Sequence, residues 1–354
     1  MRSTHPDTRQ LLHGVSRSFG LSIRLLPATL RQAVGLAYLL ARTADTIADT
    51  TSQPAGHRLA LLDSLQSAID APHDLPQLEL AQALDDFAQH VANPHEQTLL
   101  RQTQPCLAAL AQLPETDQTA IRQVLAAITE GQRWDLGTLD TPQQAGVQTR
   151  QEIDRYTWLV AGSVGEFWTR LCAEHLQGWH IGHTADLMRW GAHYGKGLQR
   201  LNILRDAGSD LRAGRCYWPA EELQPLELDR ARLCEAARTG DTATLDRLTP
   251  LLEAWHHTTQ ELLHDGLRYS LALRGWRLRL ASALPCLIGI RTLALLRQAG
   301  PQALVRHIKL PRRAVHKQLI ALVLCGVSDR QLTASWTRAL PASRPLPRSA
   351  RIGA

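Results

Sequence analysis

Apolar positions in this chain recur in long runs rich in Ala, Leu, Gln and Arg, most of them good helix formers. No strand-like alternation of useful length interrupts them, and no segment repeats another. The pattern therefore predicts an all-α protein. Pro27 suits the first turn of one of the long helices. The expected helices span residues 28–50, 115–136, 149–176, 184–214, 219–237, 241–272, 276–298 and 311–325.

The connections between these segments are short, and no stretch of linker composition divides the middle of the chain. We therefore expect one domain over residues 6–332, between a flexible N-terminus at 1–5 and a flexible basic tail at 333–354. Long helices around a central space are typical of a large bundle, in which ligand sites lie between facing helices.

Composition and charge narrow the class of partner. Of the 354 residues, 44% are hydrophobic and 20% charged, which suits a globular core, and the formal net charge is +6. A basic excess is compatible with nucleic acid, an anionic membrane or an anionic small substrate. Because Lys and Arg do not cluster with interleaved aromatic residues, we expect no nucleic-acid partner. A phosphorylated substrate or a membrane surface fits better.

Cysteines and apolar segments bear on the compartment. The six cysteines form no C-x-x-C pair and fit reduced, packed thiols of a cytoplasmic protein. The N-terminus lacks the apolar core of a signal peptide. The most apolar stretch, 278–296, contains Arg279, Pro285 and Arg291, which favours a buried helix over a transmembrane span.

Two aspartate pairs carry the strongest chemical signal. Asp45 and Asp49 are four residues apart, as are Asp206 and Asp210, so each pair lies on one face of its helix. Both pairs stand in apolar helices, where unpaired carboxylates cost several kcal/mol per ion. A single pair of aspartates at this spacing is most simply explained by a solvated helix face or by an ion-pair site within the helix. Two pairs, each beside an arginine (Arg42 and Arg205), instead favour a cavity that holds Mg²⁺ and a diphosphate.

Other residues leave alternatives open. Ser16 and Arg17 fit either a helix N-terminus or a phosphate contact. Gly162 and Gly165 indicate either close helix packing or an open channel for an alkyl chain. Tyr38 and Tyr156 need hydrogen-bond partners if they are buried. The basic run at 306–317 is either solvated surface or a contact for a nucleotide phosphate or an anionic membrane.

The segments "SRSF", "RTADTIAD", "YTWLVAGSVG" and "LQRLNILRDAGSDLRAGRCYWP" resemble the successive motifs of the squalene/phytoene synthase family, in order, from about residue 12 to 325. The resemblance implies an all-α isoprenoid synthase bundle around an apolar cavity. It also implies Mg²⁺-dependent, head-to-head condensation of two prenyl diphosphates. Thr46 and Trp218 favour the squalene-forming branch, which uses farnesyl diphosphate and NADPH.

Residue roles follow from the resemblance alone. It implies metal binding by Asp45, Asp49, Asn202, Asp206 and Asp210, with the four aspartates and Tyr156 as catalytic residues; Tyr156 would help to remove the proton that closes a cyclopropane. The implied substrate-binding residues are Ser16, Arg17, Phe19, Tyr38, Arg42, Gln199, Asn202, Arg205 and Arg215. The implied NADPH contacts are Arg17, Arg42, Arg205, Lys309 and Arg312, the last two aligned only across a gap at Pro311.

The chain also departs from its eukaryotic relatives. Ala48 replaces a glutamate of the first motif, and Ala281 stands where those enzymes place an aromatic residue thought to shield a carbocation. The alternatives are therefore a phytoene- or dehydrosqualene-forming enzyme without a reductant, or a non-catalytic lipid-binding relative. We expect a monomer with a peripheral membrane contact, for which the Arg-bearing tail is one candidate.

Overall fold

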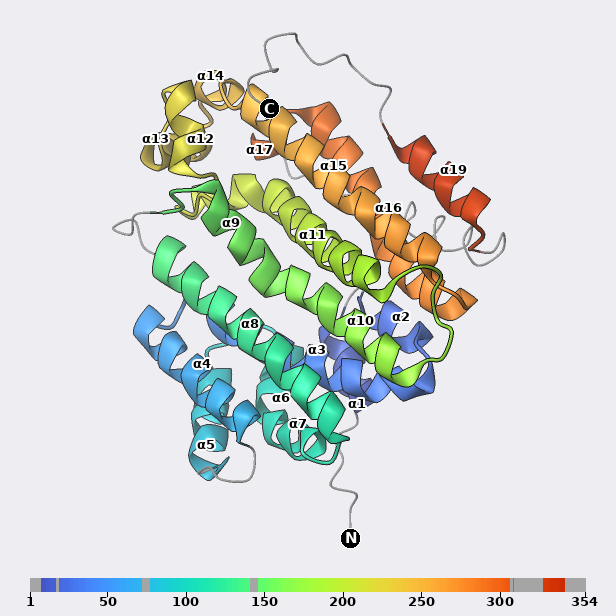
Figure 1. Cartoon of the computed structure of the whole chain (residues 1–354). Helices are drawn as coiled ribbons and strands as arrows, with labels where there is room; N and C mark the ends of the chain where they lie inside the picture. The colour runs from blue at the N-terminus through green and yellow to red at the C-terminus, as the bar shows by residue number, and fades with distance from the viewer. Residues whose placement is uncertain are drawn as a thin grey trace.

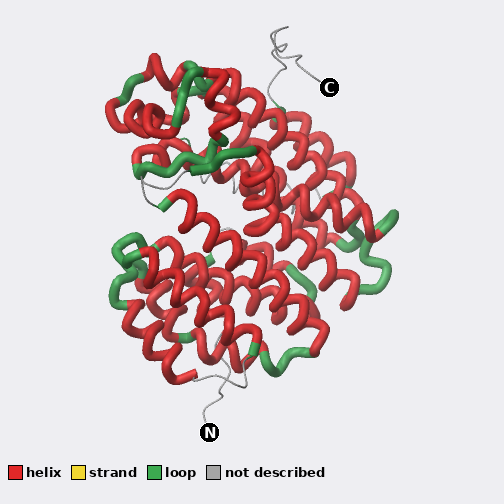
Figure 2. The backbone as a smooth tube through the Cα atoms, turned by 60° about the vertical axis from the view of Figure 1, so that its left-hand side comes forward, coloured by secondary structure: helices red, strands yellow, loops and turns green. Residues whose placement is uncertain are grey.

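The computed structural model describes residues 8–16, 19–71, 77–140, 146–305, 308 and 327–340. These residues form helices joined by loops, and no strand occurs among them (Figure 2). The all-α prediction is confirmed. A single bridge between His180 and Leu273 is the one β-type pairing within these ranges.

The N-terminal helices build the lower part of the molecule in Figure 1. Leu36, Leu62 and Leu125 belong to a buried cluster that holds them together. These helices are α1 (Thr8–Val15), α2 (Phe19–Leu25), α3 (Ala28–Asp49), α4 (Ala55–Asp70), α5 (Gln77–Ala88), α6 (Pro94–Arg101), α7 (Thr103–Leu110) and α8 (Glu115–Leu139).

The remaining helices build the upper part around a second buried cluster, in which Leu204, Trp255 and Leu287 come from three long helices. They are α9 (Arg150–Thr157), the π-helical η1 (Trp158–Gly162), α10 (Ser163–His175), α11 (Thr184–Arg212), α12 (Ala220–Leu223), the 3₁₀ turn η2 (Gln224–Leu226), α13 (Arg230–Thr239), α14 (Thr242–Asp246), α15 (Thr249–Ala272), α16 (Trp276–Ala299), α17 (Gln302–Val305) and α19 (Asp329–Ala339).

The helices predicted at 28–50, 115–136, 184–214 and 276–298 are confirmed as α3, α8, α11 and α16. The segment 149–176 is helical throughout, with η1 between α9 and α10. Two segments that were predicted as single continuous helices are each broken in the structure. The segment 219–237 breaks after η2, where Glu227 has a left-handed φ of 52°, and 241–272 breaks before Thr249. The helix expected at 311–325 lies outside the described residues.

The expected flexible tail begins too early. Residues 333–339 belong to α19, whose N-cap is Ser328 and whose Trp336 is only 5% exposed. Because Trp336 and Leu332 belong to the second buried cluster, the packed part of the chain reaches Ala339.

Small residues bring α11 against η1 and α10. A Cβ added at Gly165 would lie 1.9 Å from the carbonyl oxygen of Gly191, and one at Gly195 would lie 2.0 Å from that of Ala161. Close packing therefore explains these glycines. Gly165 and Gly195 also line a cavity, whereas Gly162 is not among its described lining residues. The role of these glycines in holding an alkyl chain stays a prediction.

Helix α16 has the length and composition of a membrane span, but 67% of its most apolar window is buried among the other helices. That burial is typical of a core helix, as the sequence predicts for 278–296. Pro285 lies inside α16, where it faces the cavity.

Candidate active site

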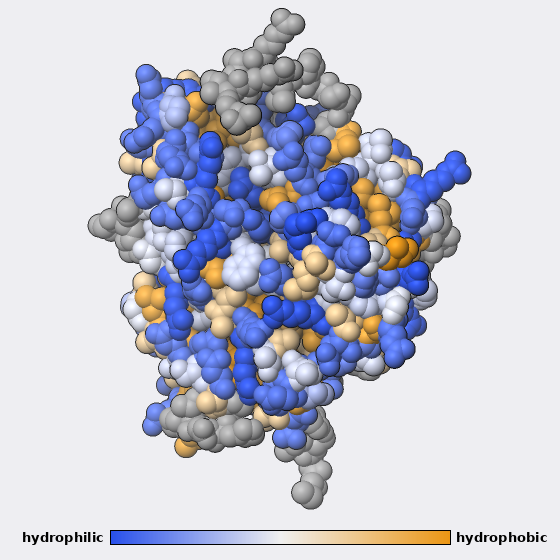
Figure 3. Space-filling model, viewed as in Figure 1, coloured by the Kyte–Doolittle hydropathy of each residue, from blue (hydrophilic) through white to orange (hydrophobic). Residues whose placement is uncertain are grey.

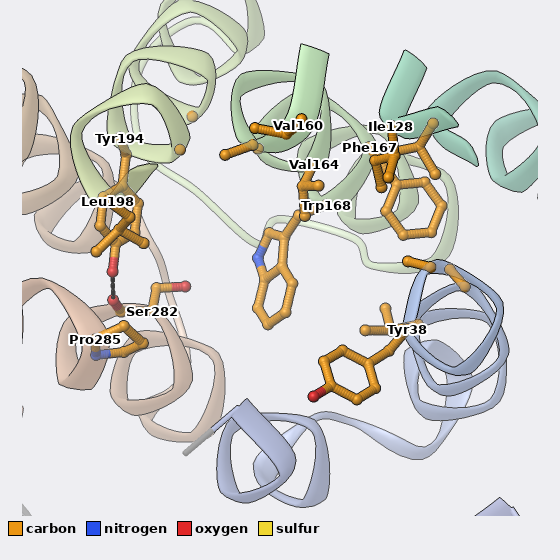
Figure 4. A pocket seen from close by; sticks show the side chains of 18 of the residues that line it. Tyr38, Ile128, Val160, Val164, Phe167, Trp168, Tyr194, Leu198, Ser282 and Pro285 are labelled. Carbon is orange, nitrogen blue, oxygen red and sulfur yellow. Dashed lines mark hydrogen bonds between the residues drawn. The ribbon is translucent and has the colours of Figure 1, made fainter. Parts of the chain in front are cut away.

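A cavity of about 400 Å³ lies between the helices of the two buried clusters. Figure 4 shows Trp168 of α10 projecting into it, with Tyr38 of α3 on one side and Tyr194 and Leu198 of α11 on another. The Tyr194 hydroxyl donates to the carbonyl of Ser282 over 2.9 Å, which fixes α11 against α16. The described residues that line the cavity are Val34, Ala37, Tyr38, Ala41, Asp45, Val124, Ile128, Val160, Ala161, Val164, Gly165, Phe167, Trp168, Gly191, Tyr194, Gly195, Leu198, Asn202, Tyr269, Ala281, Ser282 and Pro285.

The lining is almost entirely apolar, and its chemistry changes at one end. Asp45 from α3 and Asn202 from α11 are the carboxylate and the carboxamide among the described lining residues. Asp49 lies one turn beyond Asp45, while Asp206 and Asp210 lie one and two turns beyond Asn202. The two aspartate motifs therefore mark the polar mouth of an apolar cavity.

The first motif is poorly solvated although it is accessible from the cavity. The Asp45 side chain is 44% exposed, yet its surroundings are largely protein. Burial raises the pKa of Asp45 to about 7, and repulsion from Asp49 adds to the shift. Gln132 of α8 donates a hydrogen bond to the Asp45 carboxylate, and this bond acts to lower the pKa of Asp45. Burial also raises the pKa of Asp49.

The second motif has the same character. Burial raises the pKa of Asp210 to about 7, and Asp206 adds to the shift. The Asp49 carboxylate, on the facing helix, also raises the pKa of Asp210. The two motifs are therefore close enough for their charges to interact.

Three arginines surround these carboxylates. Arg42 contacts Glu96 of α6, with 2.5 Å between Nη2 and Oε1, and its Nη1 lies 3.8 Å from Asp45. Arg205 donates two hydrogen bonds, of 2.9 and 2.6 Å, to the carboxylate of its neighbour Asp206. Each of these guanidinium groups already pairs with a carboxylate. A diphosphate would therefore have to compete with that carboxylate for the arginine.

Arg215, just after α11, is part of a partly buried network that the sequence did not reveal. It donates to Asp135 of α8 and, over 2.7 Å, to the Tyr217 hydroxyl. Tyr217 in turn donates to Asp135 over 2.6 Å. Burial acts to lower the pKa of Arg215, but the combined effect of Asp135, Tyr217 and Asp210 outweighs it, and the pKa is raised. Arg215 therefore remains a cation beside Asp49 and lowers that carboxylate's pKa.

Tyr156 packs behind this network. Its ring lies 4.9 Å from that of Trp134 and 5.7 Å from that of Tyr217, and the residue is 7% exposed. Burial raises the pKa of Tyr156 well above 10, with Asp135 adding to the shift. A phenol in this setting stays protonated and is a weak base. Its role in proton removal therefore stays a prediction.

The other expected site residues are only partly placed. Tyr38 lines the cavity, and its hydroxyl lies 3.5 Å from the carbonyl of Val15. Asn202 donates to Gln199 over 3.3 Å. Ser16 donates to the carbonyl of Leu12 in the last turn of α1. Arg17, the Phe19 side chain, Lys309 and Arg312 lie outside the described residues.

Missed residues come from helices that carry no recognisable motif. Asp135 and Gln132 lie on α8, and Glu96 lies on α6. Each contacts a residue of the motifs that is distant in sequence, so no short sequence motif contains both partners. One signal was available: Gln132 and Asp135 are three residues apart, a spacing that places both on one face of α8.

The carboxylates fit Mg²⁺ only in part by themselves. Within the described residues, no three His, Cys, Asp or Glu side chains converge closely enough to hold a metal ion. Mg²⁺ is usually held by one or two carboxylates, and waters and substrate phosphates complete its octahedron. Burial is the main cause of the raised pKa of Asp45 and Asp210, so a bound cation would favour the charged form of both carboxylates. The donor set therefore fits magnesium held together with a diphosphate.

The fold and the site together define the class: an all-α bundle with carboxylates at the mouth of an apolar cavity. Comparison identifies the family within that class. The model of the squalene/phytoene synthase family matches residues 12–314. The chain belongs to this family.

Curated and solved relatives agree with this assignment. The chain is similar to squalene synthase from Mycosarcoma maydis, with 26% identity over 90% of the chain and 54% of the relative. It also resembles a solved TcSQS structure in complex with the ligand E5700, with a TM-score of 0.71 and 23% identity over 94% and 90% of the two chains. A dehydrosqualene synthase structure gives a TM-score of 0.58 and 21% identity over 94% of both. Both structures show the isoprenoid synthase fold, and the chain spans about half the length of the fungal relative.

Proposed function

We propose that this protein condenses two farnesyl diphosphates head to head at the mouth of the cavity. The observation that carries the proposal is the convergence of two aspartate motifs from α3 and α11 at the polar end of an apolar cavity. The family assignment and the relatives named squalene synthase support the same reaction.

The polar mouth would bind the diphosphates. Mg²⁺ held by Asp45, Asp49, Asn202, Asp206 and Asp210 would supply the positive charge that stabilises the departing diphosphate. Arg215 would add a fixed cation there, because Asp135 and Tyr217 already orient its guanidinium.

The apolar walls would hold the alkyl chains. Val164, Phe167 and Trp168 line the side formed by α10, and Leu198 lines that of α11. These side chains exclude water, which would otherwise react with an allylic cation. The change from carboxylates to apolar side chains along one cavity matches the two halves of a prenyl diphosphate.

Replacement of Asp206 by Asn tests the proposal. We expect loss of Mg²⁺-dependent diphosphate release from farnesyl diphosphate, with the fold retained by circular dichroism. Asp186→Asn is the matched control, because Asp186 lies on the same helix in an exposed pair with Arg189. Undiminished turnover by Asp206→Asn would contradict the proposal. Wild-type protein that releases no diphosphate would favour a non-catalytic lipid-binding relative.

For the product, we propose squalene, formed with NADPH as reductant, on the basis of the named relatives and the motif resemblance. One observation favours the non-reductive alternative, dehydrosqualene: Ala281, which replaces an aromatic residue, lines the cavity wall. Of the expected NADPH contacts, Arg42 and Arg205 are engaged by Glu96 and Asp206. Product mass after incubation with farnesyl or geranylgeranyl diphosphate, with and without NADPH, separates squalene, dehydrosqualene and phytoene.

A further inference from the structure

Two large apolar side chains are exposed at one end of the molecule. Ile181, in the loop between α10 and α11, is 57% exposed, and Trp276, the first residue of α16, is 59% exposed. Their segments are joined by the His180–Leu273 bridge and by backbone bonds from Ile181 to Ala272 and from Arg274 to Trp179. Figure 3 shows hydrophobic residues at the right-hand edge of the molecule, where this loop lies in Figure 1.

The same end is basic. Arg274 and Arg277 are exposed beside Trp276, and the Arg277 guanidinium lies 5.3 Å from the Trp276 ring centroid. Neither residues 176–185 nor residues 273–285 include an acidic residue. Of the nearby acids, Asp186 and Asp329 are paired with Arg189 and Arg279, and Glu174 is exposed near the end of α10. We call Ile181, Arg274, Trp276 and Arg277 the loop surface.

The loop surface lies at the apolar end of the cavity. Helices α10 and α15 end there, and α11 and α16 begin there. At 1.5 Å per residue, Trp276 is about 8 Å along α16 from the lining residue Ala281. Along α11, the lining residue Gly191 is about 10 Å from the helix start, whereas Asn202 is about 27 Å from it. The carboxylates are therefore at the far end.

We propose that the loop surface docks this protein on the headgroup region of an anionic lipid bilayer. Trp favours the membrane interface, and each exposed arginine contributes about 1 kcal/mol near an anionic surface. Two isolated apolar side chains are too small an area for a stable protein partner, which needs about 800 Å² on each side. Docking brings the apolar end of the cavity to the lipid and leaves the diphosphate end in water. The benefit for release of an apolar product rests on the proposed function; the binding itself does not.

Vesicle sedimentation of the purified full chain tests the proposal. We expect binding to vesicles of phosphatidylcholine with phosphatidylglycerol, weakened by high salt, and little binding to phosphatidylcholine alone. Arg274→Gln and Arg277→Gln should each weaken binding about fivefold. Trp276→Glu and Ile181→Glu should each weaken it about tenfold.

The matched control is Leu78→Glu on α5, because Leu78 is 81% exposed in the other part of the molecule. We expect it to bind vesicles like the wild type. Thermal unfolding confirms that each variant is folded. Wild-type protein that ignores anionic vesicles, or Trp276→Glu protein that binds them fully, would overturn the proposal. A dimer in light scattering that Trp276→Glu abolishes would overturn it in favour of contact between copies.

The proposal and the proposed function can fail separately. Asp206→Asn should lose diphosphate release and still bind vesicles as the wild type does. Trp276→Glu should lose vesicle binding and still release diphosphate in solution. If Trp276→Glu also stops diphosphate release in solution, the loop surface is part of the active fold and the docking role is overturned.

Discussion

At the scale of single residues, the site is defined by negative charge in poorly solvated surroundings. The pKa values of Asp45 and Asp210 are both raised to about 7, by burial first and by neighbouring carboxylates second. Between about pH 4 and pH 7 the native state therefore keeps protons that an unfolded chain has released. The contribution of both groups to the free energy of unfolding falls as the pH rises through this window.

Asp210→Asn should therefore stabilise the metal-free protein at pH 7.5. We expect a gain on the order of 1 kcal/mol after allowance for solvent screening, and almost no gain near pH 4. Thermal unfolding in EDTA at several pH values measures the difference between variant and wild type. A difference that does not change with pH would contradict the raised pKa.

Asp135→Asn tests the network around Arg215. The substitution removes the carboxylate that pairs with Arg215 and accepts from Tyr217. The freed guanidinium should then pair with Asp49 and Asp210 and compete with Mg²⁺. We expect the Mg²⁺ concentration for half-maximal activity to rise several-fold, and binding of Mn²⁺, followed by electron paramagnetic resonance, to weaken in parallel.

Asp154→Asn is the control for that substitution, because it removes a carboxylate paired with Lys196 at the surface of α9. Asp135→Glu should restore part of the metal affinity, since it restores the charge. Unchanged Mn²⁺ affinity in Asp135→Asn would show that Arg215 does not compete with the metal.

At the scale of elements, the contact of α11 with η1 and α10 fixes the width of the cavity. Gly165 and Gly191 let two backbones touch, and both also line the cavity. The five residues of η1 have π-helical geometry, a local change that is frequent at functional sites. Val160 and Ala161 in this stretch face the cavity.

Gly165→Ala should destabilise the protein by about 1–3 kcal/mol, because the new methyl group would meet the Gly191 carbonyl at 1.9 Å. Gly137→Ala is the matched control: Gly137 lies in α8, and a Cβ there meets nothing within 4 Å. It should stabilise the protein by about 0.5–1 kcal/mol. Urea unfolding of both variants checks the prediction, and equal effects of the two substitutions would contradict it.

Sequence patterns predicted the long helices and the aspartate motifs because both depend on local periodicity. The same patterns failed at residues 219–237, where Pro225 lies in η2 and Glu227 reverses the chain. The network of Asp135, Tyr217 and Arg215 could not be predicted, because Asp135 lies 80 residues before Arg215 and only the packing of α8 brings them together. Such pairings depend on tertiary structure rather than on spacing.

At the scale of the whole molecule, the cavity lies where the two buried clusters meet. Asp45 belongs to a helix of the first cluster, and Asp206 and Asp210 to a helix of the second. A ligand that neutralises both motifs would therefore link the two halves and resist their separation.

Mg²⁺ and pyrophosphate together should raise the unfolding temperature at pH 7.5 by several degrees, whereas either alone should raise it less. At a hundred times the dissociation constant, binding contributes about 2.7 kcal/mol. Differential scanning fluorimetry measures the shift, and Asp49→Asn should reduce it. An equal shift with pyrophosphate in EDTA would show that the arginines alone bind the anion.

Pro285 has a consequence for the chemistry that this cavity favours. A proline has no amide hydrogen, so the carbonyl of Ala281, four residues earlier in α16, lacks its usual helical donor. The Ser282 carbonyl beside it is already bonded to Tyr194. A backbone carbonyl oxygen without its amide donor carries a fixed partial negative charge. Here the oxygen belongs to Ala281, in the apolar part of the cavity lining. The Ala281 carbonyl oxygen is therefore a fixed dipole that would stabilise positive charge formed beside α16.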